Sequence, residues 1–357
     1  MEERAAQIRE LLKTQGCTHI LVSDITDVQY ICGFKSSNAA VLISKKNNVL
    51  LTDFRYKLSA ELFIKKNPEW KLVILKESLY SSLSSLIPPG SVIGYQSGYL
   101  TVDNFFSLKK SLKKCKYIPL SSEVSLLLAV KFKKEITLMQ KAASIGDAAL
   151  EEVVKLICTG MSEIDLACKL DKLCSEMGSE HPSFETIVLF GERSALPHGR
   201  PGKRKLKKGD FILIDFGCTV GGFCSDMTRT FVSGKADEKH KFVYNVVKEA
   251  QEAARKAACA GMAADELDNK ARKPIESAGY GEEFGHALGH GVGLRVHEAP
   301  RVSPHVSITL QESMVVTIEP GIYIPEFGGV RIEDMIELRK TGSRILTSFP
   351  RNLMEIS

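Results

Sequence analysis

The chain contains one internal repeat, and this repeat constrains the fold more strongly than any other feature of the sequence. Gly160-Met-Ser-Glu-Ile-Asp-Leu166 resembles Gly261-Met-Ala-Ala-Asp-Glu-Leu267, which lies 101 residues further along. Each copy lies between two stretches of helical periodicity, at 135–158 and 164–177 for the first copy and at 237–260 and 264–278 for the second. Each is followed by a histidine, His198 or His297, and then by two predicted strands that carry carboxylates. This shared order predicts two related halves around a pseudo-twofold axis, with a site between them.

The first pair of acidic strands contains two aspartates. The apolar run 211–217 predicts a buried strand with Asp215, and 223–231 predicts a second strand with Asp226. If Val220 and Gly221 form a two-residue loop between them, residue i pairs with residue 441 − i, so that Asp215 faces Asp226. Like charges in directly opposed positions destabilise a sheet, and a bound cation would relieve that repulsion.

The second pair of acidic strands contains two glutamates. Residues 315–319 predict a strand that carries Glu319 and leads directly into the segment 320–325. Residues 326–329 predict a turn, and a strand with Glu333 follows. Folding this hairpin about Glu326 brings Glu319 near Glu333. Two acidic hairpins in two related halves would then converge on one centre.

The four carboxylates together indicate a metal site. A surface position or a salt bridge is the usual explanation for any single carboxylate. Asp215 and Glu319 lie within apolar runs, however, and buried carboxylates need partners. The four negative charges exceed what Arg229 and Arg331 would neutralise.

A glycine-rich segment supplies imidazole ligands to the same region. His286-Ala-Leu-Gly-His290-Gly-Val-Gly-Leu-Arg-Val-His297 carries three histidines within twelve residues, and its glycines permit close backbone approach. A single histidine is more often structural, whereas this cluster favours a site. Four carboxylates balance two divalent ions, and oxygen-rich ligation without thiolate suits Mn²⁺ best, with Co²⁺, Fe²⁺ or Zn²⁺ as alternatives.

The first third of the chain predicts a separate, small α/β domain. Short apolar runs at 19–23, 39–44, 49–52, 71–75 and 92–94 predict strands, and 4–13 and 56–66 predict helices. The pattern breaks near 117–122, and a long helical stretch begins near Lys134. We therefore expect domains at 1–125 and 126–357.

Charge and hydropathy exclude several classes of protein. The net charge is +5, and residues 1–125 carry 17 Lys and Arg against 11 Asp and Glu. These basic residues are scattered apart from 109–116, so we expect a solvated face and no nucleic-acid partner. No apolar run is long enough for a membrane span, and the polar N-terminus shows no signal sequence. Nine cysteines without a C-x-x-C pair indicate reduced thiols and a cytoplasmic location.

These motifs resemble the metallopeptidase family that includes Xaa-Pro aminopeptidase, prolidase and methionine aminopeptidase. The resemblance covers nearly the whole chain. In the C-terminal region it rests on 183–186, Pro197-His198, Asp215-Phe-Gly, 225–230, Gly289-His290-Gly-Val-Gly, Val296-His297-Glu-Ala-Pro, 317–323 and Gly329-Val-Arg-Ile-Glu333-Asp. In the N-terminal region it rests on 27–34 and 52–56, which are similar to the family's creatinase-like domain.

The resemblance implies a fold and a set of site residues. It implies a creatinase-like N-terminal α/β domain followed by a pita-bread catalytic domain, two α/β halves with pseudo-twofold symmetry. The implied metal ligands are Asp215, Asp226, His290, Glu319 and Glu333, with Asp226 and Glu333 bridging two ions. The implied substrate-facing and surrounding residues are His198, His286, His297, Tyr323 and Arg331.

The resemblance also implies a reaction. We expect an Xaa-Pro aminopeptidase that cleaves peptides with proline in the second position and acts as a homodimer. Glu319 would accept the proton, His297 would stabilise the oxyanion, and His198 would contact the peptide near the leaving nitrogen.

Two other functions remain open from the sequence. The first is prolidase, which cuts only Xaa-Pro dipeptides. Arg301 resembles an arginine seen in prolidases and would receive the dipeptide's carboxylate. The second is a non-catalytic metal- or peptide-binding protein on the same fold, which the intact ligand set disfavours.

Overall fold

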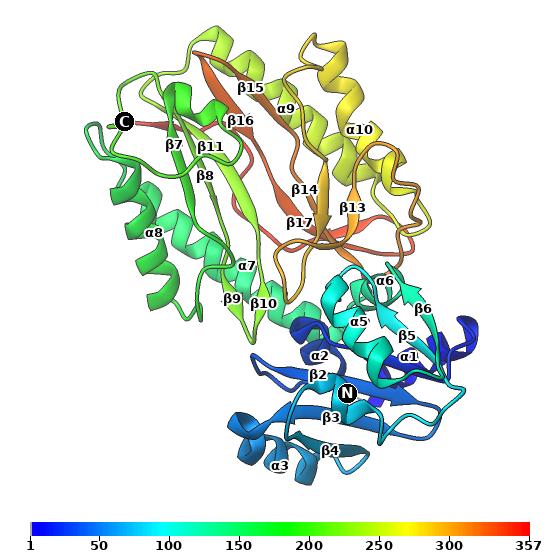
Figure 1. The fold of residues 1–357 in the computed structure, drawn as a ribbon. Helices are drawn as coiled ribbons and strands as arrows, with labels where there is room; N and C mark the ends of the chain where they lie inside the picture. The colour runs from blue at the N-terminus through cyan, green and yellow to red at the C-terminus, as the bar shows by residue number, and fades with distance from the viewer. Residues whose placement is uncertain (1) are drawn as a thin grey trace. The chain divides into compact units, whose positions relative to one another are not determined.

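The computed structural model describes residues 2–357, and the chain divides into two compact units, 1–128 and 129–357 (Figure 1). Within residues 2–357, no helix combines the length and the apolar character that a membrane span requires. All nine cysteines are free.

The first unit contains a six-stranded mixed sheet in the order β4-β3-β2-β1-β5-β6. Its strands are β1 (His19–Val22), β2 (Ala39–Ser44), β3 (Asn48–Asp53), β4 (Trp70–Leu75), β5 (Val92–Gln96) and β6 (Lys116–Leu120). Its helices are α1 (Glu2–Thr14), α2 (Ile25–Cys32), α3 (Lys57–Lys66), α4 (Leu79–Leu83), α5 (Val102–Ser111) and α6 (Glu123–Ala129), with a 3₁₀ turn η1 at Phe54–Tyr56. The strands β1, β2 and β3 are antiparallel neighbours, whereas β4, β5 and β6 join by parallel pairing.

The predicted α/β character of this unit is confirmed, but several of its elements were missed. α2 carries end signals that the prediction overlooked: Asp24 accepts hydrogen bonds from the first-turn N–H groups, and Gly33 ends the helix with a φ of 75°. α4 and α5 were also missed. β6 was missed because Pro119 breaks its apolar pattern. Proline is tolerated there because β6 is an edge strand.

The second unit consists of two halves, each with a pair of helices packed on a sheet (Figure 1). The helices of the first half are α7 (Lys133–Val154) and α8 (Glu163–Glu176), and those of the second half are α9 (Glu238–Ala257) and α10 (Ala264–Ser277). All four predicted helices are therefore confirmed. The two sheets have the strand orders β19-β11-β8-β7 and β13-β12-β14-β17-β18.

The strands of the second unit include two short pairs besides these sheets. The first half contains β7 (Ile187–Phe190), η2 (Gly191–Ala195), β8 (Phe211–Phe216), β9 (Thr219–Val220), β10 (Phe223–Cys224) and β11 (Met227–Ser233). The second half contains β12 (Gly289–Gly291), β13 (Glu298–Val302), β14 (Val315–Ile318), β15 (Gly321–Ile324), β16 (Gly328–Arg331), β17 (Asp334–Leu338) and β18 (Ser343–Ile345). The last strand, β19 (Glu355–Ile356), pairs with β11 of the first half.

The two copies of the sequence repeat make equivalent backbone hydrogen bonds. Gly160 N donates to Leu206 O at 2.9 Å, and Gly261 N donates to Leu310 O at 2.8 Å. The two glycines have φ angles of 90° and 92°, a region that glycine adopts at little cost. The predicted repeat is therefore a structural one, in which each copy joins two helices and anchors the segment that precedes its acidic strands.

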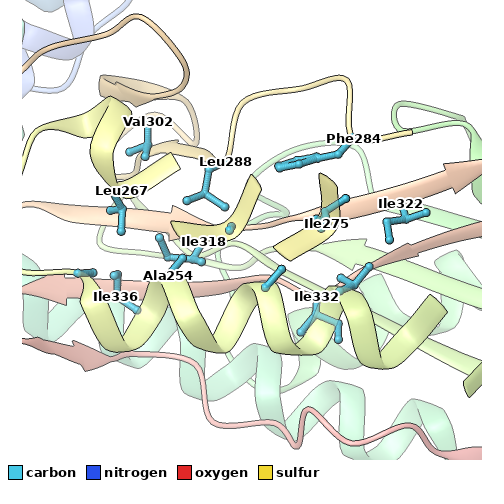
Figure 2. Packing of buried hydrophobic residues seen from close by; sticks show 14 of the residues in the cluster. Ala254, Leu267, Ile275, Phe284, Leu288, Val302, Ile318, Ile322, Ile332 and Ile336 are labelled. Atoms are coloured by element: carbon cyan, nitrogen blue, oxygen red, sulfur yellow. The ribbon is translucent and has the colours of Figure 1, made fainter. Parts of the chain in front are cut away.

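An apolar cluster fixes the strands that flank the second acidic pair (Figure 2). Leu267 and Ile275 of α10 and Ala254 of α9 lie in one cluster with Ile318 of β14 and Ile336 of β17, all at 0% exposure. Burial of an Ile or Leu side chain contributes about 1.5–3 kcal/mol. The packing therefore holds rigid the ends of β14 and β17, where Glu319 and Glu333 lie.

Candidate metal centre

The first acidic hairpin differs in register from the prediction. Across β8 and β11, Asp215 pairs with Thr228 and not with Asp226. The two-residue loop is Gly221–Gly222, with φ angles of 59° and 80°. The predicted loop was wrong because it would have required a positive φ at Val220, a β-branched residue for which that conformation is strained.

The two aspartates nevertheless meet. The observed register is shifted from the predicted one by two residues, and a shift of two leaves every side chain on the same face of the strand. Asp226 lies in the irregular segment between β10 and β11. Oxygen atoms of Asp215, Asp226 and Glu333 lie within 4.8 Å of one another.

The second acidic hairpin has the predicted register. Gly321 pairs with Arg331 across β15 and β16, and Ile318 pairs with Asp334 across β14 and β17. Glu319 and Glu333 are the opposed residues between these two pairs, so the predicted proximity is confirmed. Ligand atoms of His290, Glu319 and Glu333 form a second group within 4.8 Å.

The cluster lines a cavity of about 520 Å³. Its lining includes all five predicted ligands, Asp215, Asp226, His290, Glu319 and Glu333. Asp226 and Glu333 are 3% and 2% exposed, and Asp215 is 8% exposed. Side chains from both halves of the second unit therefore converge at one point, as the repeat predicted.

Arg331 and Thr228 hold the carboxylates in place. Arg331 Nη2 donates to Asp215 Oδ2 at 2.6 Å, and its Nε donates to Thr228 Oγ1 at 3.0 Å. The Thr228 hydroxyl in turn donates to Glu333 Oε2 at 2.6 Å. One arginine and one threonine thus connect the acidic residues of the two halves.

The pKa values show that this cluster lacks positive charge. Burial raises the pKa of Asp226 and of Glu333 well above the ordinary carboxyl value, and neighbouring carboxylates raise both further. Burial also raises the pKa of Asp215, although Arg331 opposes the shift. Burial acts on Glu319 in the same direction, but the hydrogen bond and charge of His290 outweigh it and lower the pKa of Glu319 to about 2.

The residues present fit divalent metal ions. Asp215 Oδ1 is buried and makes no hydrogen bond, and a buried carboxylate oxygen without a partner is costly. The candidate donors are four carboxylates and the imidazoles of His290 and His297, without thiolate, which suits Mn²⁺ and related ions. A ligand histidine also needs a fixed ring orientation, and His290 Nδ1 bonds to Gly291 O at 3.1 Å, which leaves Nε2 facing Glu319.

The other predicted histidines surround the same cavity. His198, His286 and His297 line it, and His198 and His297 are exposed. The His297 ring lies 4.2 Å from that of His290, centroid to centroid. Partial desolvation of its ring by the cavity wall lowers the pKa of His297, and His290 lowers it further, so the neutral imidazole is favoured.

Tyr323 lies beside the cavity and joins two of the predicted residues. Arg331 Nη1 donates to the Tyr323 hydroxyl at 2.8 Å, and that hydroxyl bonds to His286 Nε2 at 2.9 Å. His286 Nδ1 lies 2.8 Å from Ala287 O, so it carries the ring proton, and Nε2 accepts from Tyr323. Burial lowers the pKa of His286, which agrees with this neutral form.

Sequence reasoning missed two threonines that support the ligands. Thr228 contacts Glu333 as described, and Thr317 Oγ1 donates to Glu319 Oε1 at 3.0 Å. Each lies two residues from a ligand, Asp226 or Glu319, so strand alternation could have placed it on the same face. Arg229, considered as a partner for the carboxylates, lies on the opposite face and pairs with Asp334 at 2.8 Å.

The chain matches two family models. Residues 137–340 match the model of metallopeptidase family M24, and residues 4–127 match the creatinase/prolidase N-terminal domain. The creatinase-like and pita-bread domains implied by the resemblance are thereby supported. The six-stranded sheet lies in the region that matches the first model, the creatinase/prolidase N-terminal domain, and most strands of the four- and five-stranded sheets lie in the region that matches the metallopeptidase model.

The similar proteins span the whole chain. A curated relative, the Xaa-Pro dipeptidase of Pyrococcus furiosus, is 35% identical over 99% of this chain and 100% of its own length. Among solved structures, an Xaa-Pro dipeptidase from Bacillus anthracis has a TM-score of 0.93 at 35% identity and 99% coverage of both chains. An X-Pro aminopeptidase from Thermotoga maritima has a TM-score of 0.88 at 34% identity, again with 99% coverage of both chains.

Proposed function

Since the chain belongs to metallopeptidase family M24, we propose that it is an Xaa-Pro dipeptidase that hydrolyses its substrates with two divalent metal ions. The observation that carries the choice of a dipeptide is the placement of Arg301 beside the acidic cluster. Aminopeptidase activity on longer peptides was the main expectation from the sequence, and dipeptidase activity was its alternative.

The position of Arg301 supports a role in binding a carboxylate. It pairs with His290 across β12 and β13, and directly opposed side chains on one face have Cβ atoms about 4.5–5.5 Å apart. It is exposed and lines the cavity, and residues 2–357 offer its guanidinium no hydrogen bond or ion pair. The guanidinium fork matches a carboxylate in two-point geometry.

The length and charge of a dipeptide suit this arrangement. Two extended residues span about 7 Å, with a positive amine at one end and a carboxylate at the other. The acidic cluster would attract the amine, and Arg301 would receive the carboxylate. A longer peptide has an uncharged amide where the dipeptide has its carboxylate, so it would lose this interaction.

The names of the relatives support the same choice. Two archaeal relatives, from Pyrococcus furiosus and Pyrococcus horikoshii, are called Xaa-Pro dipeptidases at 35% and 36% identity. The solved structure from Bacillus anthracis carries this name as well. Because the similar structure from Thermotoga maritima is named an X-Pro aminopeptidase, aminopeptidase activity is the second candidate function.

We assign the metal site to Asp215, Asp226, His290, Glu319 and Glu333, with Mn²⁺ as the proposed ion. Two such ions supply an activated nucleophile at neutral pH and polarise the scissile carbonyl. Asp226 and Glu333, the most deeply buried pair, are proposed to bridge them.

We propose roles for three side chains in moving the proton and in stabilising the groups that react. Glu319 would take a proton at Oε2, because Oε1 already accepts from Thr317. The neutral His297 would donate a hydrogen bond to the developing oxyanion. His198, which lines the same cavity from the first half of the unit, would contact the peptide near the leaving nitrogen.

A substrate comparison tests the proposal. The Mn²⁺-loaded protein is assayed with Gly-Pro, Gly-Pro-Ala and Gly-Ala, and kcat/KM is measured for each. Dipeptidase activity predicts the highest value for Gly-Pro. An equal or higher value for Gly-Pro-Ala would identify an aminopeptidase, and no hydrolysis of either proline peptide would contradict both activities.

A further inference from the structure

In each half of the second unit, the second helix contributes a fully buried carboxylate that lies outside the metal site. Glu163 begins α8 and Asp268 lies within α10, and both are 0% exposed. A buried carboxylate must be paired and hydrogen-bonded. In both cases its partners belong to a loop that carries a histidine of the cavity.

Glu163 binds both ends of the loop that carries His198. Its Oε1 accepts from Phe190 N at 2.9 Å, and its Oε2 accepts from Gly202 N at 2.7 Å. Arg193 Nε, within the same loop, donates to both oxygens at 3.0 Å. One carboxylate therefore closes a loop of residues 190–202 around His198.

Asp268 and Arg272 bind the loop that carries His286. Asp268 Oδ1 accepts from Leu288 N at 3.1 Å, and Arg272 forms a two-point pair with Asp268 at 2.7 and 3.0 Å. The Arg272 guanidinium also donates to Phe284 O and to His286 O, both at 2.9 Å. Figure 2 shows Phe284 and Leu288 at the two ends of this loop, beside α10.

We propose that Glu163 and Asp268 are positioning residues, each of which sets the place of one cavity histidine, His198 or His286, against the substrate. The proposal rests on the proposed peptidase function. His198 is exposed, so contacts of its ring do little to place it, and the backbone bonds at both ends of its loop set its position. His286 contacts Tyr323, and the bonds of Arg272 hold the backbone from which that contact is made.

Double-mutant cycles test whether each carboxylate acts through its own histidine. Glu163→Gln should lower kcat/KM for Gly-Pro on the order of 10-fold to 10²-fold, the scale for displacing a catalytic contact from a distance. In a His198→Ala background the same change should add less than about 2-fold, whereas in a His286→Ala background it should keep its full effect, because independent sites add. Asp268→Asn should show the reverse dependence. A full effect of Glu163→Gln in both backgrounds would overturn the proposal.

Two measurements separate positioning from loss of fold or metal. Metal content and the melting temperature of each variant are compared with wild type, and Arg193→Gln and Arg272→Gln serve as second variants if the acidic ones do not fold. Glu180→Gln is the matched control, because Glu180 also accepts from two backbone N–H groups, those of Gly221 and Gly222, outside the cavity. It should leave kcat/KM unchanged.

Hydrogen exchange tests the proposal without any assay of activity. In metal-free Glu163→Gln, the amide of Gly202 should exchange faster while that of Leu288 stays protected, and Asp268→Asn should give the opposite result. Unchanged exchange at Gly202 and Leu288 would overturn the positioning role. A wild-type protein that hydrolyses no Xaa-Pro peptide would instead overturn the proposed function, and the exchange result would still decide whether the loops are held as inferred.

Discussion

Arg331 Nη2 donates a 2.6 Å hydrogen bond to Asp215 Oδ2 inside the carboxylate cluster. In the described part of the chain, no other Lys or Arg bonds to the four clustered carboxylates, so one guanidinium and the imidazole of His290 face four acids. Burial of such an excess of negative charge is strongly unfavourable without added cations.

Metal content should depend on the proposed bridging residues. Wild-type protein reconstituted with Mn²⁺ is expected to hold about two ions per chain, as a two-metal site requires. Asp226→Asn or Glu333→Gln should lose both ions, because each of these carboxylates is proposed to bind both of them. Elemental analysis after gel filtration measures the ratio, with Glu337→Gln, a salt-bridge variant on β17, as the control. A full complement in either bridging variant would contradict the assignment.

The raised pKa values of Asp226, Glu333 and His290 should make the metal-free protein less stable as the pH rises from about 6 to 8. The folded-state pKa values of Asp226 and Glu333 are raised by burial and that of His290 is raised by Glu319, which outweighs its own burial. A group with a raised folded pKa contributes stability that is complete below its unfolded pKa, near 4 for a carboxyl, and is lost as the pH rises through the folded value. Glu319, with its pKa lowered to about 2, adds stability as the pH rises through the unfolded carboxyl value near 4 and contributes no slope above about pH 6. His286 and His297, with lowered pKa values, contribute an opposite slope near about pH 6.5, so the comparison with Asp226→Asn isolates the effect of the carboxylates.

Mn²⁺ should reverse this trend. Metal binding requires deprotonated ligands, so the increase in melting temperature on adding Mn²⁺ should be larger at pH 8 than at pH 6. Thermal unfolding in EDTA and in Mn²⁺ at each pH gives the comparison. Asp226→Asn should flatten this loss of stability in the metal-free protein, and a loss from about pH 6 to 8 in EDTA that is the same in Asp226→Asn and in wild type would contradict the prediction.

His297→Ala should keep both metal ions and lose activity. Its ring lies beside His290 and shares one candidate ligand group with Asp226 and His290, but the two groups that contain Glu333 do not include it. Loss of one oxyanion donor lowers kcat by about 10²-fold or more. Steady-state kinetics with Gly-Pro and parallel elemental analysis measure the two effects. Near wild-type turnover would move the oxyanion role to Tyr323 or to the metals.

Arg301→Ala should discriminate between substrates. If its guanidinium binds the dipeptide's carboxylate, kcat/KM for Gly-Pro should fall by about 10-fold to 10²-fold, equivalent to a charged hydrogen bond of about 1.5–3 kcal/mol. The rate for Gly-Pro-NH₂, which has no carboxylate, should change little. Arg301→Lys keeps the charge without the fork and should recover part of the loss. Equal losses for both substrates would exclude carboxylate binding.

Thr228→Val should lower the free energy of unfolding, because Thr228 hydrogen-bonds within the carboxylate cluster. Its hydroxyl donates to Glu333 and accepts from Arg331, and valine offers neither bond at the same volume. Leaving these buried groups without a partner costs about 1–3 kcal/mol, measurable by urea unfolding. Thr228→Ser keeps the hydroxyl and should retain most of the stability. A valine variant as stable as wild type would show that other groups satisfy Glu333 and Arg331.

Local patterns predicted the helices and the acidic strands because they are short-range properties. The four helices of the second unit follow from apolar periodicity, and the hairpin centred on Glu326 has the register that its turn predicts. The missed elements were those whose apolar pattern is short or interrupted. β6 contains Pro119 and depends on its place at the edge of the sheet, which no local pattern records.

In the first acidic hairpin, the local sequence left the position of the loop undecided, but it determined on which face the two aspartates lie. Two loops were compatible with Val220-Gly221-Gly222, and backbone strain selected the glycine pair. The choice moved Thr228 opposite Asp215, yet both alternatives leave Asp226 on the same face because alternation has a period of two. Residue spacing thus decided which acids share a face.

The sequence by itself determined the repeat, the helices, the two acidic hairpins and the identity of the clustered acids, because each depends on spacing within one half. Only the tertiary structure decided which groups distant in the sequence bond to one another, both across the two halves and within one half. Arg331 with Asp215, Thr228 with Glu333 and Glu163 with Gly202 join residues 39 to 116 positions apart. Such contacts arise where the packing of helices and sheets brings together segments that are far apart in the sequence. The periodicity within a single strand or helix carries no information about which distant segment will pack against it.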